Sequence, residues 1–163
     1  EDSFLDTVLA TMERHGIEPN NLCLEMTESI LMERDDHGIA MLTQLREKGV
    51  HLAIDDFGTG YSSLTALRRL PVDLLKIDQS FIASLPQDGD AGTIAWAIVR
   101  LGHTLGIPVL AEGVENVEQH EALRRFGCDQ AQGYLFGRPM PAPQFTELLD
   151  AQRGATSAGA AAV

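Results

Sequence analysis

Basic residues are scarce in this sequence. Its 163 residues include 12 lysines and arginines against 24 aspartates and glutamates, which gives a formal net charge of -12. A chain of this charge is repelled by a DNA duplex and by an anionic membrane surface, so we expect neither as a partner. A phosphate-bearing ligand would need metal ions to offset the same repulsion.

Cysteines and long apolar runs are also rare. Cys23 and Cys128 lie far apart and form no CxxC motif, so the sequence shows no disulfide framework and favours a reducing cytoplasm. Charges or glycines interrupt each apolar stretch before the roughly 20 residues that a membrane-spanning helix needs. Residues 1–3 lack the basic start of a signal peptide. With 44% apolar residues, the sequence predicts a cytoplasmic globular domain without membrane insertion.

Helical patterns alternate with short apolar runs along the chain. Apolar residues spaced by three and four predict helices over 2–15, 39–48, 64–70, 94–105 and 117–126, with a short final helix around 145–149. Buried strands are expected at 22–26, 51–54, 74–78, 108–112 and 132–136. The alanine- and glycine-rich segment 151–163 is expected to be a flexible tail.

This alternation predicts an α/β fold with parallel strands joined by crossover helices. Two architectures remain open at this point. One is a five-stranded doubly wound sheet, which a chain of this length can complete. The other is a partial (β/α)8 TIM-like barrel of about five strand-helix units, with the first three strands absent.

Polar residues lie at the carboxyl end of each expected strand. In parallel α/β folds these ends form one face, so residues scattered in sequence converge there. Crowded carboxylates repel one another unless a cation offsets them, and all-oxygen ligands favour Mg²⁺ or Mn²⁺ over Zn²⁺. The residues concerned are Glu25, Glu28, Asp55, Asp56, Lys76, Asp78, Glu112, Glu115 and Gln132.

The pair Asp55-Asp56 is ambiguous in sequence. Consecutive strand residues point to opposite faces, so both carboxylates can bind one metal cluster only if the strand ends or bends there. The following Phe57, Gly58, Thr59 and Gly60 permit such a bend. The same glycine-rich segment is either a simple turn before a helix or a mobile loop that closes over a ligand.

Lys76 and the neighbouring acids have alternative interpretations. Lys76 points to the same side of its strand as Asp78, so it either pairs with Asp78 or lies beside the acids and stabilises phosphate charge. Glu28 and Glu115 are either site residues or acids near helix N-termini. A response-regulator receiver also has five strand-helix units, an acidic pair and a lysine, but there the acids follow the first strand and the lysine the fifth.

Five motifs, in order and spacing, resemble those of the EAL-domain family. The resemblance covers residues 1–150 and identifies them as the C-terminal portion of an EAL domain. The implied protein is a bacterial cyclic di-GMP phosphodiesterase that hydrolyses cyclic di-GMP to linear pGpG with two metal ions, on a (β/α)8 barrel. The motifs are Leu24-Glu25-Met26-Thr27-Glu28, Asp55-Asp56-Phe57-Gly58-Thr59-Gly60-Tyr61-Ser62-Ser63-Leu64, Lys76-Ile77-Asp78, Ala111-Glu112-Gly113-Val114-Glu115 and Gln132-Gly133-Tyr134.

The resemblance also implies roles for individual residues. Glu25, Asp55, Asp56 and Glu112 are similar to metal ligands, and Lys76 and Glu112 to catalytic groups beside the attacking water. Glu28 is similar to the glutamate that anchors the mobile loop Phe57, Gly58, Thr59 and Gly60. The implied substrate-binding residues are Gln132, Glu115 and Asp78.

In the family, the Glu-Ala-Leu segment and a metal-binding asparagine lie upstream of the helix that begins this sequence, so neither is present at its family position here. We therefore expect an incomplete Mg²⁺ or Mn²⁺ site and reduced activity of the chain alone. Unpaired strand edges predict a homodimer or pairing with the rest of an EAL domain. The alternative function is a non-catalytic module that binds cyclic di-GMP or a protein.

Overall fold

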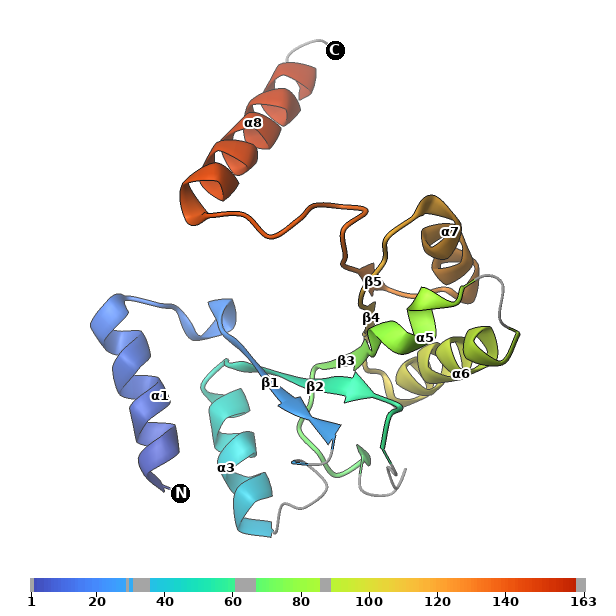
Figure 1. The fold of residues 1–163 in the computed structure, drawn as a ribbon. Coiled ribbons are helices and arrows are strands. Elements are labelled where there is room, and N and C mark those ends of the chain that lie inside the picture. The colour runs from blue at the N-terminus through green and yellow to red at the C-terminus, as the bar shows by residue number, and fades with distance from the viewer. Residues whose placement is uncertain (1, 29, 31–35, 61–66, 86–88, 161–163) are drawn as a thin grey trace.

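The computed structural model describes residues 2–28, 30, 36–60, 67–85 and 89–160 (Figure 1). Helices and strands alternate along the chain, as the sequence predicts. In order, the elements are α1 (Asp2–His15), the 3-10 turn η1 (Pro19–Asn21), β1 (Cys23–Thr27), α3 (Asp36–Glu47), β2 (His51–Phe57), β3 (Leu74–Ile77), α5 (Gln79–Ala83), α6 (Gly89–Leu105), β4 (Val109–Ala111), α7 (Val117–Phe126), β5 (Gln130–Ala131) and α8 (Ala142–Ala160).

The five strands form one parallel sheet in the order β1-β2-β3-β4-β5. Each strand therefore pairs with its neighbours in sequence, and the order never reverses. A doubly wound sheet contains a reversal point, and the flavodoxin-like order of a receiver is 2-1-3-4-5. The sequential order is that of a barrel segment, which decides between the two architectures and excludes the receiver.

The core lies between the sheet and its helices. Leu52 and Ile54 on β2 and Leu75 and Ile77 on β3 are fully buried. Each such side chain contributes about 1.5–3 kcal/mol of burial free energy. The helices contribute further buried residues to the same cluster: Leu42, Leu45, Val99 and Leu123.

Helix α7 shows how the sequence fixes an element's ends. The side chain of Asn116 accepts a hydrogen bond from the Gln119 backbone N–H, and Gln119 bonds back to the Asn116 N–H, which makes a capping box. Gly127 ends the helix with a φ of 81°, a left-handed conformation that favours glycine. These caps fix the two ends of α7. The segments next to them carry the site residues Glu115, before the helix, and Gln132, after it.

Strands β1 and β5 differ from the sequence expectation. β1 was expected to be a buried strand, but its residues alternate between exposed and partly buried, and no described strand covers its outer edge. β5 is Gln130–Ala131, and most of the expected strand 132–136 forms a turn instead. A two-residue strand is too short to leave an alternating pattern in the sequence.

The last helix is longer than expected. α8 runs from Ala142 to Ala160 and takes in most of the segment assigned to a tail. Alanine has the highest intrinsic helix propensity, which explains a helix without a strong apolar stripe. Figure 1 shows α8 away from the sheet. Most of the expected helix 64–70 lies outside the described residues.

None of the described helices combines the length and the apolar character that crossing a bilayer requires.

Candidate active site

A β-bulge places Asp55 and Asp56 on the same side of the sheet. Between the pairs Ile54–Leu75 and Phe57–Ile77 the register shifts, so that β2 has one residue more than β3. Asp56 takes up the extra length with a φ of 53°, an uncommon conformation for a residue other than glycine. The bulge removes the alternation that would otherwise separate two consecutive side chains.

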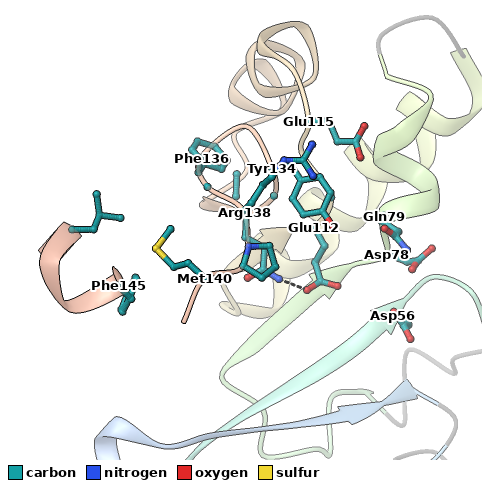
Figure 2. Close-up of a pocket in the computed structure, with 17 residues that line it drawn as sticks. Asp56, Asp78, Gln79, Glu112, Glu115, Tyr134, Phe136, Arg138, Met140 and Phe145 are labelled. Atoms are coloured by element: carbon teal, nitrogen blue, oxygen red, sulfur yellow. Dashed lines mark hydrogen bonds between the residues drawn. The ribbon is translucent and has the colours of Figure 1, made fainter. Parts of the chain in front are cut away.

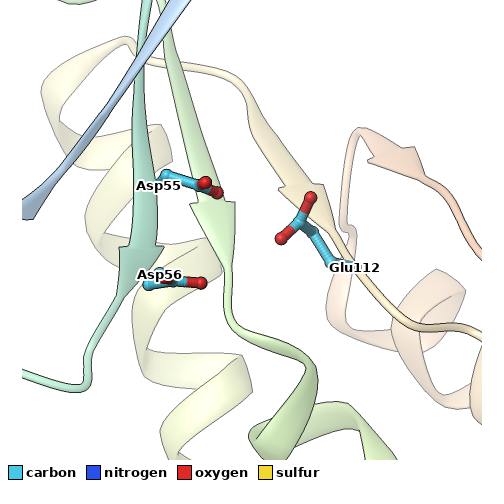
Figure 3. Close-up of side chains that lie close together, drawn as sticks. All are labelled: Asp55, Asp56 and Glu112. Carbon is cyan, nitrogen blue, oxygen red and sulfur yellow. The ribbon is translucent and has the colours of Figure 1, made fainter.

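The acidic pair faces Glu112, which follows β4 (Figure 3). One carboxylate oxygen from each of Asp55, Asp56 and Glu112 lies within 4.8 Å of the other two. The three side chains are partly buried and offer oxygen ligands alone, which suits a hard cation such as Mg²⁺ or Mn²⁺. The donor set therefore fits the metal that the sequence predicts.

Lys76 lies at the centre of the acids. Its side chain is 4% exposed, and Nζ donates to Glu25 Oε2 at 2.6 Å and to Asp55 Oδ1 at 2.8 Å. Nζ also lies 2.9 Å from Glu112 Oε1. The lysine on β3 thus joins acids from β1, β2 and the end of β4. Its partner in the alternative interpretation, Asp78, instead accepts hydrogen bonds from Ser80.

The surroundings of Lys76 and of Asp56 shift the pKa values of these two groups. Burial alone would lower the pKa of Lys76, but its hydrogen bonds to Asp55, Glu25 and Glu112 outweigh burial and raise the pKa above its usual range. Burial and the negative charges of Asp55 and Asp78 raise the pKa of Asp56. The site therefore keeps its lysine charged and carries excess negative charge around Asp56.

Glu28 belongs to the glycine loop and not to the carboxylate cluster. Its side chain is buried, and Oε2 accepts a hydrogen bond from the Gly58 backbone N–H at 3.1 Å. Gly60 approaches so closely that a Cβ there would lie 2.8 Å from Glu28 Oε1. Among the described residues this Oε1 has no hydrogen-bond partner. Phe57 ends β2 at the start of the same loop, and Thr59 bonds back to Asp56.

A cavity of about 730 Å³ opens beside the acids (Figure 2). Asp56, Asp78, Glu112, Glu115 and Gln132 all line it, so sequence-predicted residues from four separate segments meet there. The Gln132 side-chain amide donates to Glu112 Oε1 at 2.5 Å. The remaining candidate ligand, Glu25, is linked to this group through Lys76.

Several cavity residues were missed by sequence reasoning. They lie in the segment 133–140 that follows β5, in α8, and at the start of α5. The sequence feature that could have indicated them is the group of aromatic, arginine and proline residues directly after the Gln132-Gly133-Tyr134 motif. These wall residues include Gln79, Phe136, Arg138, Pro139, Met140, Phe145 and Leu148.

The family model described as "EAL domain" matches residues 1–139. This chain belongs to the EAL domain family. The matched residues include Asp55 and Asp56 of the bulge, Lys76, Glu112 and Gln132. As an EAL chain, it has its acidic residues at the carboxyl ends of consecutive parallel strands, where a barrel enzyme holds its active site.

Relatives within the EAL family are similar in sequence and in structure. The chain is 51% identical to the Pseudomonas aeruginosa bifunctional diguanylate cyclase/cyclic di-GMP phosphodiesterase MucR, over 86% of this chain and 20% of MucR. It is 48% identical to the cyclic di-GMP phosphodiesterase NbdA of the same organism, over 93% of this chain and 19% of NbdA. The chain thus spans about a fifth of the length of these curated relatives.

Solved EAL structures match the fold closely. The structure of the MucR phosphodiesterase in complex with cyclic di-GMP superposes with a TM-score of 0.83 at 51% identity, over 86% of this chain and 57% of that one. A manganese and cyclic di-GMP complex of Klebsiella pneumoniae BlrP1 gives a TM-score of 0.72 at 37% identity, over 85% and 34% of the two chains.

Proposed function

We propose that this chain carries the metal-binding face of a cyclic di-GMP phosphodiesterase, which hydrolyses cyclic di-GMP to linear pGpG. The observation that carries the proposal is the meeting of Asp55, Asp56 and Glu112 beside a buried lysine, with Asp56 and Glu112 also lining a cavity of about 730 Å³. The names of MucR and NbdA support the same activity, since both are called cyclic di-GMP phosphodiesterases.

We assign the metal site to Asp55, Asp56, Glu112 and Glu25, with Mg²⁺ or Mn²⁺ as the cation. A pair of such ions supplies Lewis acidity and an activated water for phosphodiester hydrolysis. Asp55 belongs to the triad and also accepts a hydrogen bond from Lys76, and we assign it as the ligand that would be shared by the two ions. The BlrP1 complex with manganese supports a divalent cation in this family.

Lys76 and Glu112 are the proposed catalytic residues of the chain. The Lys76 ammonium remains charged beside the acids, where it offsets negative charge on phosphate in the transition state. Glu112 accepts from both Lys76 and Gln132, which fixes the orientation of its carboxylate. A carboxylate held in this way can accept and orient a proton of the attacking water.

The cavity residues Gln132, Glu115 and Asp78 are the proposed substrate contacts, because all three line the space beside the acids. Glu28 acts through the loop Phe57, Gly58, Thr59 and Gly60, which it anchors by the hydrogen bond to Gly58. In this proposal the loop moves when substrate binds, and Asp56, at its base, moves with it.

Residues 1–150 form, in this proposal, the C-terminal portion of an EAL barrel, and α8 continues beyond them to Ala160. The support is the open sheet, in which β1 and β5 each have one described partner strand. Unpaired edges of a parallel sheet pair readily with other strands. We propose that further EAL strands or a second copy of the chain occupies them.

The test is hydrolysis of cyclic di-GMP by the protein in the full length that its gene encodes. Formation of pGpG is followed by chromatography with Mg²⁺ or Mn²⁺, and with a chelator as control. The proposal expects metal-dependent product. Absence of product together with absence of cyclic di-GMP binding would refute it.

A non-catalytic module that binds cyclic di-GMP is the second candidate. The open edges of β1 and β5 favour it for the isolated chain, because metal ligands from missing strands would be absent. Binding of cyclic di-GMP without formation of pGpG would select this candidate.

A further inference from the structure

The charges around the cavity are very unequal. Four acidic side chains line it: Asp56, Asp78, Glu112 and Glu115. Among the described residues that form its wall, Arg138 is the one lysine or arginine. An arginine among so many acids would be expected to form an ion pair. In the part of the chain that the structure describes, no carboxylate lies within ion-pairing distance of Arg138.

Arg138 is positioned by an aromatic ring instead. Its Cζ atom lies 4.4 Å from the centroid of the Tyr134 ring, over the ring face. This cation–π contact occupies a face of the guanidinium and leaves the N–H donors at its edge free for a ligand. Figure 2 shows Tyr134 and Arg138 together on the cavity wall, at some remove from Asp56.

The cavity residues that neighbour Arg138 in sequence are apolar. Phe136, Pro139 and Met140 line the cavity with Arg138, and so do Phe145 and Leu148 of α8. Surfaces of this kind bury the faces of nucleobases, whereas a phosphate group favours polar surroundings. The acids at Asp56 and Glu112 mark the separate region where the reacting phosphate belongs.

We infer that Arg138, held over Tyr134, recognises a guanine base of the substrate through its O6 and N7 atoms. The inference rests on the proposed function, because cyclic di-GMP supplies the base. Guanine presents two adjacent acceptors on this edge, which the two-donor fork of an arginine matches. Adenine presents an acceptor and an amino donor there, and an arginine has no acceptor for that donor.

Arg138 is thus a specificity residue that touches the substrate away from the reacting atoms. Lysine at this position would keep the positive charge but lose the planar fork. A contact with phosphate would survive the change to lysine in large part, because lysine also binds phosphate as a point charge. A bidentate contact with guanine would be lost.

The test compares two ligands and two proteins. The ligands are cyclic di-GMP and its 7-deaza analogue, in which a C–H replaces each guanine N7 while both phosphates remain. The proteins are the wild type and Arg138→Lys, each in the full length that the gene encodes. Affinities are measured by calorimetry with Ca²⁺ in place of Mg²⁺, and chromatography verifies that the ligand stays intact.

The inference predicts that the wild type binds the analogue roughly tenfold more weakly than cyclic di-GMP. Arg138→Lys should bind cyclic di-GMP about as weakly as the wild type binds the analogue, and should hardly distinguish the two ligands. Arg124→Lys is the matched control, since Arg124 lies on α7 outside the cavity wall and is paired with Glu121. It should behave as the wild type does.

Three results would overturn the inference. Equal losses for both ligands in Arg138→Lys would show that Arg138 does not contact guanine N7, and little loss for either would mean that Arg138 contacts a phosphate or lies outside the substrate site. Failure of the wild type to bind cyclic di-GMP would refute the proposed function as well. Arg138 is exposed, so its replacement should leave the melting temperature unchanged and the comparison valid.

Discussion

Lys76 Nζ and Glu25 Oε2 lie 2.6 Å apart, although β2 separates their two strands. The contact ties the edge strand β1 to the centre of the sheet. Because Lys76 also contacts Asp55 and Glu112, the side chain of a single buried residue holds together acids that would otherwise repel one another.

Replacement of Lys76 by methionine should therefore destabilise the fold. The three carboxylates would lose their shared counter-charge, while methionine fills a similar volume. We expect the free energy of unfolding to fall by about 2 kcal/mol. This is less than the loss expected when a wholly buried ion pair is broken, because Glu25 is half exposed and solvent screens its charge. Urea denaturation at pH 7 measures it. Equal stability of Lys76→Met and wild type would contradict the account.

The pH dependence of that difference has a defined sign. The pKa of Lys76 is raised in the folded state, so its contribution is fully present below the unfolded lysine value of about 10.4. It is lost only as the pH rises through the higher folded-state value. The difference between wild type and Lys76→Met should stay constant from about pH 7 to 10. A decline within this range would show that Lys76 is not held charged by the acids.

Asp78 caps α5 and gives a second prediction. Burial raises the pKa of Asp78, but hydrogen bonds from the Ser80 side chain and backbone outweigh it and lower the pKa. Asp78→Ala should cost about 1 kcal/mol at neutral pH. Because the folded-state pKa is depressed, this contribution is present above the unfolded value of about 3.9 and lost as the pH falls through the folded one.

Urea midpoints at a series of pH values test the Asp78 prediction. Asp78→Asn keeps an acceptor for Ser80 but loses the negative charge, so at neutral pH it should be less stable than the wild type and more stable than Asp78→Ala. A gap between Asp78→Ala and wild type that persists unchanged in acid would contradict the assigned cause.

Glu28→Ala should loosen the glycine loop. The substitution removes the acceptor of the Gly58 N–H and leaves a void beside Gly60. We expect faster hydrogen exchange at the Gly58 amide and a loss of about 1–3 kcal/mol in stability. Glu28→Gln, which keeps an acceptor oxygen of the same reach, is the matched variant. Unchanged exchange at Gly58 in Glu28→Ala would show that Glu28 does not anchor the loop.

The sequence predicted the parts of the site that depend on strand order. Acids and Lys76 at successive strand ends were expected to converge, and Asp55, Asp56 and Glu112 do lie together. The sequence did not reveal how consecutive aspartates share one face. That depends on the bulge, a register shift between β2 and β3 that has no local signature other than the following glycines.

Other features escaped prediction for related reasons. α5 has five residues and β5 two, and neither is long enough to show a period. The position of Arg138 over Tyr134 depends on the turn after β5, which places residues four apart in sequence face to face outside any helix. The contact between Arg138 and Tyr134 therefore follows from the tertiary structure and could not be predicted from the two residue types.

Binding of Mn²⁺ is the most direct test of the central claim, that the bulge gathers a cation site from Asp55, Asp56 and Glu112. The electron paramagnetic resonance signal of free Mn²⁺ is followed as protein is added. Asp55→Asn should weaken binding by at least about tenfold. The control is Asp36→Asn, which removes an exposed acid paired with Arg69, outside the triad.

The account predicts that the wild type and Asp36→Asn deplete the free Mn²⁺ signal equally while Asp55→Asn leaves it nearly intact. Equal depletion by all three proteins would contradict it.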